Sequence, residues 1–319
     1  MRVVIASRLS DALFEQVRDA AGPDAEIVCA TTEADLLPLM AEADIFLGGN
    51  IGSLTPALLA AAPRLHWVHS TGAGVEDMLF PAFIASDVLL TNARGAHQVA
   101  MPEYVLMAML AWAHHLPALF RAQTRREWIK PIPDEVAGKT LGLLGYGEIG
   151  RAVAERARSL GIRCLAYRRT PDRPEGRAFV ERVHGPNELH AFLGACDVVV
   201  NSLPLTHDTR GLLDARALAA MRPDAILIHL GRGPTVDQDA LLAALRERRI
   251  AGAFLDVFDQ EPLPPESPFW ELENAIITSH TSGYSVHYFE RSIAIFCENL
   301  RRFRAGQPLR NVVDKHLGY

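Results

Sequence analysis

A glycine-rich turn between an apolar run and an amphipathic helical pattern constrains this chain more than any other feature. Residues 140–144 lead into Gly145, Gly147 and Gly150, which have the spacing G-x-G-x-x-G, and helical periodicity follows over Glu148–Leu160. In a strand–turn–helix, the first glycine permits the tight turn, the second lets the backbone approach a pyrophosphate, and the third lets the helix pack on the strand. The helix N-terminus then presents N–H groups to the phosphates. We therefore predict dinucleotide binding by Gly145, Tyr146, Gly147, Glu148, Ile149 and Gly150.

Length, charge and cysteine usage limit the classes of protein to which this chain can belong. A chain of 319 residues, 49% of them hydrophobic, suits two globular domains. A net charge of −6 gives no electrostatic case for binding nucleic acid or anionic membranes, and no run approaches the roughly 18–20 apolar residues of a membrane span. The four cysteines are scattered without a C-x-x-C pair, which argues against a disulfide framework or a zinc site. We expect a cytoplasmic protein without a bound metal.

Short apolar runs alternate with helical windows in two successive series, a pattern typical of parallel sheets built from strand–helix units. We therefore expect an α/β protein with two doubly wound parallel-sheet domains. The expected strands are Val3–Ala6, Ile27–Cys29, Ile45–Leu47, Trp67–His69, Val88–Leu90, Thr140–Leu144, Arg163–Tyr167, Val198–Asn201, Ile226–His229, Gly252–Leu255 and Ile276–Thr278.

Between the two series, a long helical window over Glu103–Arg125 is apolar on nearly every side. Such a helix is buried, so we place it at a domain junction or in a subunit interface. A second long window, Val286–Arg304, is expected to return the chain to the first domain.

The residues that follow the second strand of the dinucleotide unit help to determine whether NAD or NADP is bound. An acidic residue there usually binds the ribose 2′-hydroxyl of NAD, whereas arginine pairs with the 2′-phosphate of NADP. Here the strand Arg163–Tyr167 is followed by Arg168, Arg169 and Thr170, so we predict a preference for NADP(H). A solvated basic loop is the alternative interpretation, and the nearby Asp172 leaves NAD(H) open.

Arg232, Glu261 and His280 each lie past the C-terminal end of an expected strand, the edge at which open α/β sheets bind ligands. A histidine suits proton transfer near neutral pH, and a neighbouring carboxylate favours its imidazolium form and orients the ring. An arginine binds a substrate carboxylate. Taken singly, these residues would more often be a structural histidine, a solvated loop residue and a surface ion pair.

In these segments the chain resembles the D-isomer-specific 2-hydroxyacid dehydrogenases, and the resemblance covers nearly its whole length. It rests on several motifs in the family's order. They are the glycine turn, Asp197–Thr206, Thr209–Gly211, Gly231–Pro234, Glu261–Pro268, the His280 segment, and the tail segments Glu298–Leu300 and Asn311–Asp314. Within the family, the glyoxylate/hydroxypyruvate reductase branch is the most similar.

The resemblance implies a Rossmann coenzyme domain over residues 102–284 and a flavodoxin-like substrate (lid) domain made of residues 1–101 and 285–319. It implies an oxidoreductase that reduces a small 2-keto acid such as glyoxylate or hydroxypyruvate. It also implies a homodimer, with Glu103–Arg125 in the interface.

The resemblance further assigns roles to individual residues. It makes Arg232, Glu261 and His280 the catalytic set, with His280 as the proton donor or acceptor. A loop of the first domain, formed by Thr71, Gly72, Ala73 and Gly74, binds the substrate carboxylate through backbone N–H groups. Further contacts to the nucleotide are implied for Leu203, Pro204, Thr209, Leu230, Gly231, Asp256 and Ser282.

Two departures from the family pattern leave the substrate open. Ser279 precedes His280 where relatives commonly have proline, and Met101-Pro102-Glu103 occupies a place where many relatives have Ala-Glu. A nucleotide-sensing protein of the same fold is the alternative from another class, although it would not need the proton donor. Within the enzymes, a related NAD-dependent dehydrogenase for another acid, such as formate, phosphite or phosphoglycerate, is the alternative.

Overall fold

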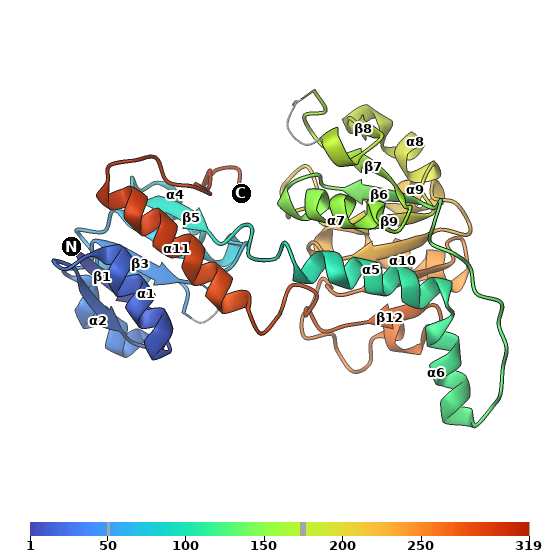
Figure 1. Ribbon diagram of the computed structural model, residues 1–319, viewed down its shortest axis with the longest axis horizontal. Helices are drawn as coiled ribbons and strands as arrows, with labels where there is room; N and C mark the ends of the chain where they lie inside the picture. Colours follow the sequence, from blue (N-terminus) through green and yellow to red (C-terminus); the bar gives the residue numbers. More distant parts are fainter. Residues whose placement is uncertain (50–51, 173–176, 319) are drawn as a thin grey trace. The chain divides into compact units, whose positions relative to one another are not determined.

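The computed structural model describes residues 1–49, 52–172 and 177–318. The chain forms two compact units, one from Met1–Ala96 with Ser285–Tyr319 and the other from His97–Tyr284. We call them unit 1 and unit 2, and Figure 1 shows the helices and strands of each. The chain crosses between the units after residues 96 and 284, where crossings after residues 101 and 284 were predicted.

Unit 1 contains a parallel sheet of five strands in the order β2-β1-β3-β4-β5, which is the flavodoxin-like order. The long helix α11 brings the C-terminal part of the chain back to lie alongside α1 (Figure 1). The strands are β1 (Arg2–Ile5), β2 (Glu26–Cys29), β3 (Ile45–Gly48), β4 (Trp67–Ser70) and β5 (Leu89–Asn92). The helices are α1 (Asp11–Ala21), α2 (Glu33–Met40), α3 (Pro56–Ala60), η1 (Glu76–Met78), α4 (Pro81–Ile84) and α11 (Tyr288–Arg304).

Both faces of the unit 1 sheet are covered. Val4 and Phe46 pack in an apolar layer with α2 and α3, whereas their neighbours Val3 and Ile45 pack in a second layer with α1 and α11. All four side chains are fully buried. Because side chains alternate along a strand, burial on both faces requires apolar residues at successive positions, which explains the continuous apolar runs of the sequence.

Unit 2 contains a parallel sheet of seven strands in the order β12-β11-β10-β9-β6-β7-β8. The six strands β6 to β11 have the Rossmann order, and β12 extends the sheet at one edge. The strands are β6 (Thr140–Leu144), β7 (Arg163–Tyr167), β8 (Arg182–His184), β9 (Val198–Asn201), β10 (Ile226–His229), β11 (Gly252–Leu255) and β12 (Ala275–Ile277). The helices are α5 (Ala100–Ala113), α6 (Leu116–Arg125), α7 (Glu148–Arg158), η2 (Arg177–Phe179), η3 (Pro186–Glu188), α8 (Leu189–Gly194), α9 (Ala215–Ala219), η4 (Gly233–Thr235), α10 (Gln238–Arg246) and η5 (Pro268–Glu271).

Helices also cover both faces of the unit 2 sheet. Leu143 of β6 packs in one apolar layer with Val153 of α7, and its neighbour Leu144 packs in the other with Phe192 of α8 and Leu241 of α10. These five side chains are buried. Two doubly wound parallel sheets, as predicted from the alternation of apolar runs and helical windows, are therefore confirmed.

The prediction of one helix over Glu103–Arg125 is wrong. The structure has two helices there, α5 and α6, which are bent by 62° relative to each other. The chain turns at His115, which has φ 54°, and Pro117 lies in the first turn of α6. Inside a longer helix the ring of Pro117 would clash with the carbonyl of Ala113, so a new helix begins here. Most of the apolar face of α5 is buried, whereas α6, described in full, buries Ala122 alone.

Helices α5 and α6 are also the segment to examine for a possible membrane span. Within the described residues, no single helix is long and apolar enough to cross a membrane. The pair α5 and α6 meets the requirement of length and composition when taken together across its bend.

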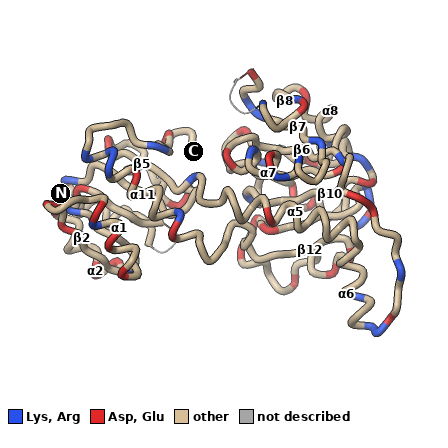
Figure 2. Tube along the Cα trace, viewed as in Figure 1, with Lys and Arg blue, Asp and Glu red and all other residues tan. Residues whose placement is uncertain are grey.

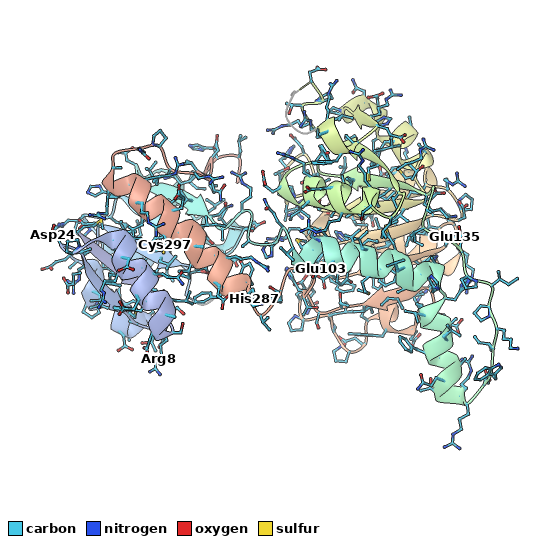
Figure 3. The ribbon with its side chains drawn as sticks, in the orientation of Figure 1. Arg8, Asp24, Glu103, Glu135, His287 and Cys297 are labelled. Carbon is cyan, nitrogen blue, oxygen red and sulfur yellow. The ribbon has the colours of Figure 1, made fainter. Side chains whose placement is uncertain are left out.

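The cysteines are free thiols, and three of them are core residues. Figure 3 labels Cys297 on α11, whose side chain is buried against the unit 1 sheet. Burial raises the pKa of the Cys164 and Cys297 thiols to about 11 and the pKa of Cys196 to about 12. These three residues therefore stay protonated near neutral pH and act as small apolar side chains.

Candidate active site

The parallel strands of unit 2 bring the predicted site loops to one edge of the sheet, because their C-terminal ends point the same way. The glycine turn follows β6, and the arginine-rich tip follows β7. The remaining predicted residues of this unit lie in segments 202–209 after β9, 230–234 after β10, 256–261 after β11 and 278–283 after β12.

The glycine turn has the geometry that its spacing predicts. Gly145 has φ 93°, a conformation that residues with a side chain rarely adopt, and its N–H donates to the carbonyl of Tyr167 at 3.1 Å. A Cβ on Gly150 would overlap the carbonyl oxygen of Gly145. Helix α7 can therefore pack against the turn only with glycine at position 150.

The turn also fits a dinucleotide phosphate. Gly147 is the N-cap of α7, and within the described residues no side-chain hydrogen bond caps the first helical turn. A Cβ built on Gly147 would meet no described atom within 4 Å, so the space beside its backbone is open. The two observations together leave N–H donors and room for an anion at the positive end of the helix dipole.

The basic tip after β7 is where the sequence predicted it. The Arg168 side chain is partly buried, and Arg169 and Thr170 are exposed. Asp172, the acidic residue nearest this tip in the sequence, has its carboxylate 4.0 Å from the guanidinium of Arg177. Both side chains are exposed to solvent, so this contact is weak.

The loops after β9 and β10 are joined by hydrogen bonds of Asn201. Its side-chain oxygen accepts from the N–H of Leu203 at 3.2 Å, and its carbonyl accepts from the N–H of Leu230 at 2.9 Å. The first of these loops is also closed on itself, because the Thr209 hydroxyl donates to the carbonyl of Pro204 at 2.7 Å. The predicted nucleotide contacts in these loops therefore lie on a hydrogen-bonded framework.

His280 and Glu261 form a hydrogen-bonded pair. Nδ1 of His280 lies 2.7 Å from Oε2 of Glu261, whose Oε1 accepts from the N–H of Phe258 at 2.9 Å. Because a carboxylate accepts, Nδ1 carries a proton and Nε2 is left for a ligand. The two side chains are 49% and 35% exposed, so a substrate can reach them. The structure thus brings together two of the three predicted catalytic residues, which are 19 positions apart.

Arg232, the third predicted catalytic residue, follows β10 directly and precedes η4. Its Nη1 donates to the carbonyl of Gly231 at 2.9 Å, and its own carbonyl accepts from the Thr235 hydroxyl at 2.7 Å. A Cβ on Gly231 would lie 2.5 Å from the carbonyl oxygen of Leu203, so glycine is needed where these two loops meet.

Asp256 holds the loop that carries His280. Its carbonyl accepts from the N–H of His280 at 2.9 Å, and its carboxylate accepts from the N–H groups of Thr281 and Ser282 at 2.9 and 3.0 Å. His280 has φ 53°, an unusual conformation for a residue with a side chain, and these bonds stabilise it. The nucleotide contacts predicted for Asp256 and Ser282 stay predictions, since the hydrogen bonds that they make here are internal.

The predicted substrate loop belongs to unit 1 and follows β4. The N–H groups of Thr71 and Gly72 are used in hydrogen bonds within unit 1, at 2.7 and 3.2 Å. Two side chains of α11 donate to the Thr71 carbonyl at 2.5 and 3.0 Å, which ties the loop to that helix. In the part of the chain that the structure describes, no hydrogen bond uses the N–H groups of Ala73 and Gly74.

Residues 106–282 match the NAD binding domain of the D-isomer specific 2-hydroxyacid dehydrogenases. The chain belongs to this family. The (S)-sulfolactate dehydrogenase of Chromohalobacter salexigens is 34% identical over 92% of this chain and 98% of its own. The glyoxylate/hydroxypyruvate reductase A of Serratia proteamaculans is 32% identical over 82% of this chain and 84% of its own. The crystal structure of an NADPH-dependent glyoxylate/hydroxypyruvate reductase from Sinorhizobium meliloti, in complex with NADP and sulfate, has a TM-score of 0.85 at 30% identity and covers 100% of this chain and 99% of that one.

As a D-2-hydroxyacid dehydrogenase, the chain is an oxidoreductase that acts on the CH–OH group of hydroxy acids with a nicotinamide dinucleotide. The predicted family and class of reaction are confirmed, and the enzyme is favoured over the nucleotide-sensing alternative. The open glycine turn fits the phosphates of this cofactor. The roles of individual residues stay predictions.

A polar network that was not predicted from the sequence lies behind the His280 loop of the dehydrogenase. Thr278 donates its hydroxyl proton to Asp256 at 2.5 Å and so accepts from Tyr104, whose hydroxyl lies 2.8 Å away. Burial raises the pKa of Tyr104 to about 12, which keeps this donor protonated. At the end of β10, burial lowers the pKa of His229 to about 4, so that ring is neutral near pH 7. Asp256 and Thr278 directly follow two apolar strands, β11 and β12, and this position was the signal that could have found them, whereas Tyr104 lies in helix α5.

Proposed function

We propose that this D-2-hydroxyacid dehydrogenase is an NADP(H)-preferring reductase of a small 2-keto acid, with glyoxylate or hydroxypyruvate as the type of substrate. The observation that carries the proposal is the 2.7 Å contact between His280 and Glu261 at a partly exposed position. A histidine held by a carboxylate can give a proton to a keto oxygen or take one from a hydroxyl group. Measuring NADPH oxidation with a panel of keto acids tests the proposal.

In this account His280 gives the proton from Nε2 to the keto oxygen of the substrate. Glu261 favours the imidazolium form and orients the ring by accepting from Nδ1. Arg232 pairs with the substrate carboxylate and stabilises the negative charge that develops on the oxygen. When bound, the nicotinamide supplies the hydride that the carbonyl carbon accepts. In the reverse direction, neutral His280 takes the proton of the hydroxyl group at the same nitrogen.

We also propose that the loop after β4 in unit 1 binds the substrate carboxylate. Its Ala73 and Gly74 supply N–H donors to the substrate carboxylate, because the N–H groups of Thr71 and Gly72 are already used within unit 1. Successive backbone N–H groups in a loop form a concave anion site without any charged side chain.

The proposed preference for NADP(H) rests on the basic tip after β7. Arg168 and Arg169 can pair with a 2′-phosphate through charge-assisted hydrogen bonds. The nearby acid, Asp172, lies five residues past the end of β7 and not at its tip. The similar reductase of Sinorhizobium meliloti was crystallised with NADP, which supports the same preference here.

The tip can be tested by replacing Arg168 with aspartate. The ratio of kcat/KM for NADPH to that for NADH should fall by about ten- to a hundredfold, because a hydrogen bond to a charged group contributes about 1.5–3 kcal/mol. The aspartate would also repel the 2′-phosphate and accept from a ribose 2′-hydroxyl. Rates are measured with one keto acid and both nucleotides, and Arg246→Asp, at an exposed position of α10, controls for the change in net charge. An unchanged ratio in Arg168→Asp would show that Arg168 does not face the 2′-phosphate.

A second type of substrate is favoured by one relative. The dehydrogenase of Chromohalobacter salexigens, which is 34% identical to this chain, acts on (S)-sulfolactate. That acid carries a sulfonate besides its carboxylate, so its keto form would need a second cationic or N–H contact in the site. Comparing the rates with sulfopyruvate and with hydroxypyruvate distinguishes the two types.

We also propose that the enzyme is a homodimer through α6 and the segment that follows it. Phe120, Trp128 and Ile132 there are 63%, 89% and 89% exposed. A pocket of about 400 Å³ beside α6, lined in part by Trp112 and Asn274, offers a recess for such side chains from a second copy. Figure 2 shows basic residues along α6 and the segment that follows it. Large exposed apolar side chains close together in sequence are typical of an interface between subunits.

The oligomeric state is measured by sedimentation equilibrium. The chain has a mass of 35.0 kDa, and the wild type should sediment with twice that mass. The double variant Trp128→Glu/Ile132→Glu should shift to the monomer, because two buried and unpaired carboxylates oppose the contact. Val286→Glu is the matched control, since Val286 is 90% exposed but lies in unit 1. A monomeric wild type, or a dimer that both glutamates leave intact, would contradict the proposed interface.

A further inference from the structure

His97 and Gly283 lie beside the two points where the chain crosses between the units. Unit 2 begins at His97 and ends at Tyr284, directly after Gly283. Nδ1 of His97 lies 3.0 Å from the carbonyl oxygen of Gly283, and because a carbonyl only accepts, Nδ1–H is the donor. The bond joins residues 186 positions apart, and its acceptor belongs to the loop that begins with His280.

The contact leaves no room for a side chain at position 283. A Cβ built on Gly283 would lie 2.6 Å from Nδ1 and 2.9 Å from Cε1 of His97. Gly283 is not among the residues with positive φ, so its backbone conformation is open to alanine. The imidazole ring, rather than the backbone, is therefore what requires glycine here.

Burial favours the neutral form of His97, and nearby positive charges act in the same direction. Burial lowers the pKa of His97, its hydrogen-bonded carbonyl opposes this, and the positive charges of Arg232 and His280 lower it further. His97 is thus close enough to both predicted catalytic residues to sense their charge. The acidic groups that contact the His280 loop are Glu261 and Asp256.

We propose that His97 is a positioning residue for His280, and that it acts by holding the loop of residues 281–283 through the Gly283 carbonyl. The loop is then held by two separate elements, because Asp256 binds the N–H groups of Thr281 and Ser282 while His97 binds the carbonyl at the far end. His97 itself need not touch the substrate. The inference rests on the proposed function of His280 as the group that transfers the proton.

Loosening this loop should act on the pair of His280 and Glu261. Their 2.7 Å contact depends on where the loop places the histidine backbone. A longer contact would weaken the hydrogen bond that Nδ1–H of His280 donates to Glu261. The proton donor would also be displaced from the substrate oxygen, and a displacement of about 1 Å in an active site can cost roughly a hundredfold in rate.

The experiment compares the full-length wild type with His97→Ala, His97→Asn, Gly283→Ala and the double variant His97→Ala/Gly283→Ala. His97→Ala and Gly283→Ala should each lower kcat by about ten- to a hundredfold, with the KM for NADPH unchanged. His97→Asn should restore most of the rate, because its amide nitrogen can donate from the place of Nδ1. The kcat of the double variant should not fall below that of the less active single variant, because both changes remove the same hydrogen bond.

The NMR signal of the Nδ1–H proton of His280 gives a second readout that needs no turnover, because a hydrogen bond to a carboxylate shifts that signal downfield. The downfield shift should be smaller in His97→Ala and Gly283→Ala than in the wild type and His97→Asn. If the wild type reduced no keto acid, the proposed function would fail, and this signal would still decide whether His97 positions His280. An unchanged Nδ1–H signal in both alanine variants, rate losses that add in the double variant, or an inactive His97→Asn would each overturn the inference. If His97→Ala does not fold, Gly283→Ala supplies the same comparison.

Discussion

Replacing His280 by alanine should lower kcat for the reduction of 2-keto acids by about 10²- to 10⁴-fold, the usual contribution of a positioned acid or base. Alanine removes the proton donor and leaves Glu261 without its partner at 2.7 Å. The dissociation constant of NADPH should stay the same, because the glycine turn after β6 is not altered. Single-turnover oxidation of NADPH, followed at the absorbance band of the reduced nicotinamide, measures the chemical step directly.

The matched control for this experiment is His207→Ala. His207 is also next to a carboxylate, with its Nδ1 3.4 Å from Asp208, but its side chain is fully exposed. It should keep the wild-type rate. A His280→Ala variant with wild-type turnover would remove His280 from the proposed mechanism, whereas a loss of NADPH binding would mean that the residue supports the cofactor site instead.

Replacing Arg232 by methionine should lower kcat/KM for the keto acid by roughly a hundredfold, since a hydrogen bond between charged groups contributes about 1.5–3 kcal/mol. Methionine keeps much of the volume and removes the charge that pairs with the substrate carboxylate. Lysine should recover only part of the loss, because its single ammonium group does not reproduce the planar fork of arginine.

Comparing a substrate that has a carboxylate with one that lacks it isolates the contribution of Arg232 to carboxylate binding. Hydroxyacetone has a ketone but no carboxylate, so the wild type and Arg232→Met should reduce it equally slowly. Discrimination between hydroxypyruvate and hydroxyacetone should therefore collapse in the variant. If Arg232→Met kept the discrimination of the wild type, another group would have to bind the carboxylate, and the N–H groups of Ala73 and Gly74 would be the first candidates.

Much of the fold was predictable because its signals are local. Continuous apolar runs indicated strands buried on both faces, and the spacing of Gly145, Gly147 and Gly150 indicated the strand–turn–helix. The edge strand β8 was not predicted. Its three residues form no apolar run, and the first of them, Arg182, is exposed. The break between α5 and α6 was also missed, although Pro117 marked it.

The geometry of the candidate site was less accessible to sequence analysis, because its contacts join distant residues. The predicted pair of His280 and Glu261 does meet in space. The part of Asp256 in holding the His280 loop depends on a loop conformation with positive φ at His280, for which no local pattern exists. The bond between His97 and Gly283 spans 186 positions and depends on where both crossings of the chain fall.

The proposed reduction of small 2-keto acids with NADPH is tested by measuring how fast the purified wild type oxidises NADPH and NADH with four keto acids. The acids are glyoxylate, hydroxypyruvate, sulfopyruvate and phenylpyruvate. Our account predicts rapid oxidation of NADPH by glyoxylate or hydroxypyruvate, slower oxidation of NADH, and little turnover of the bulky phenyl acid. A clear preference for NADH, or turnover of sulfopyruvate alone, would contradict the proposed cofactor or substrate. NADPH that binds tightly but is oxidised by none of these acids would contradict the proposed reduction of small keto acids.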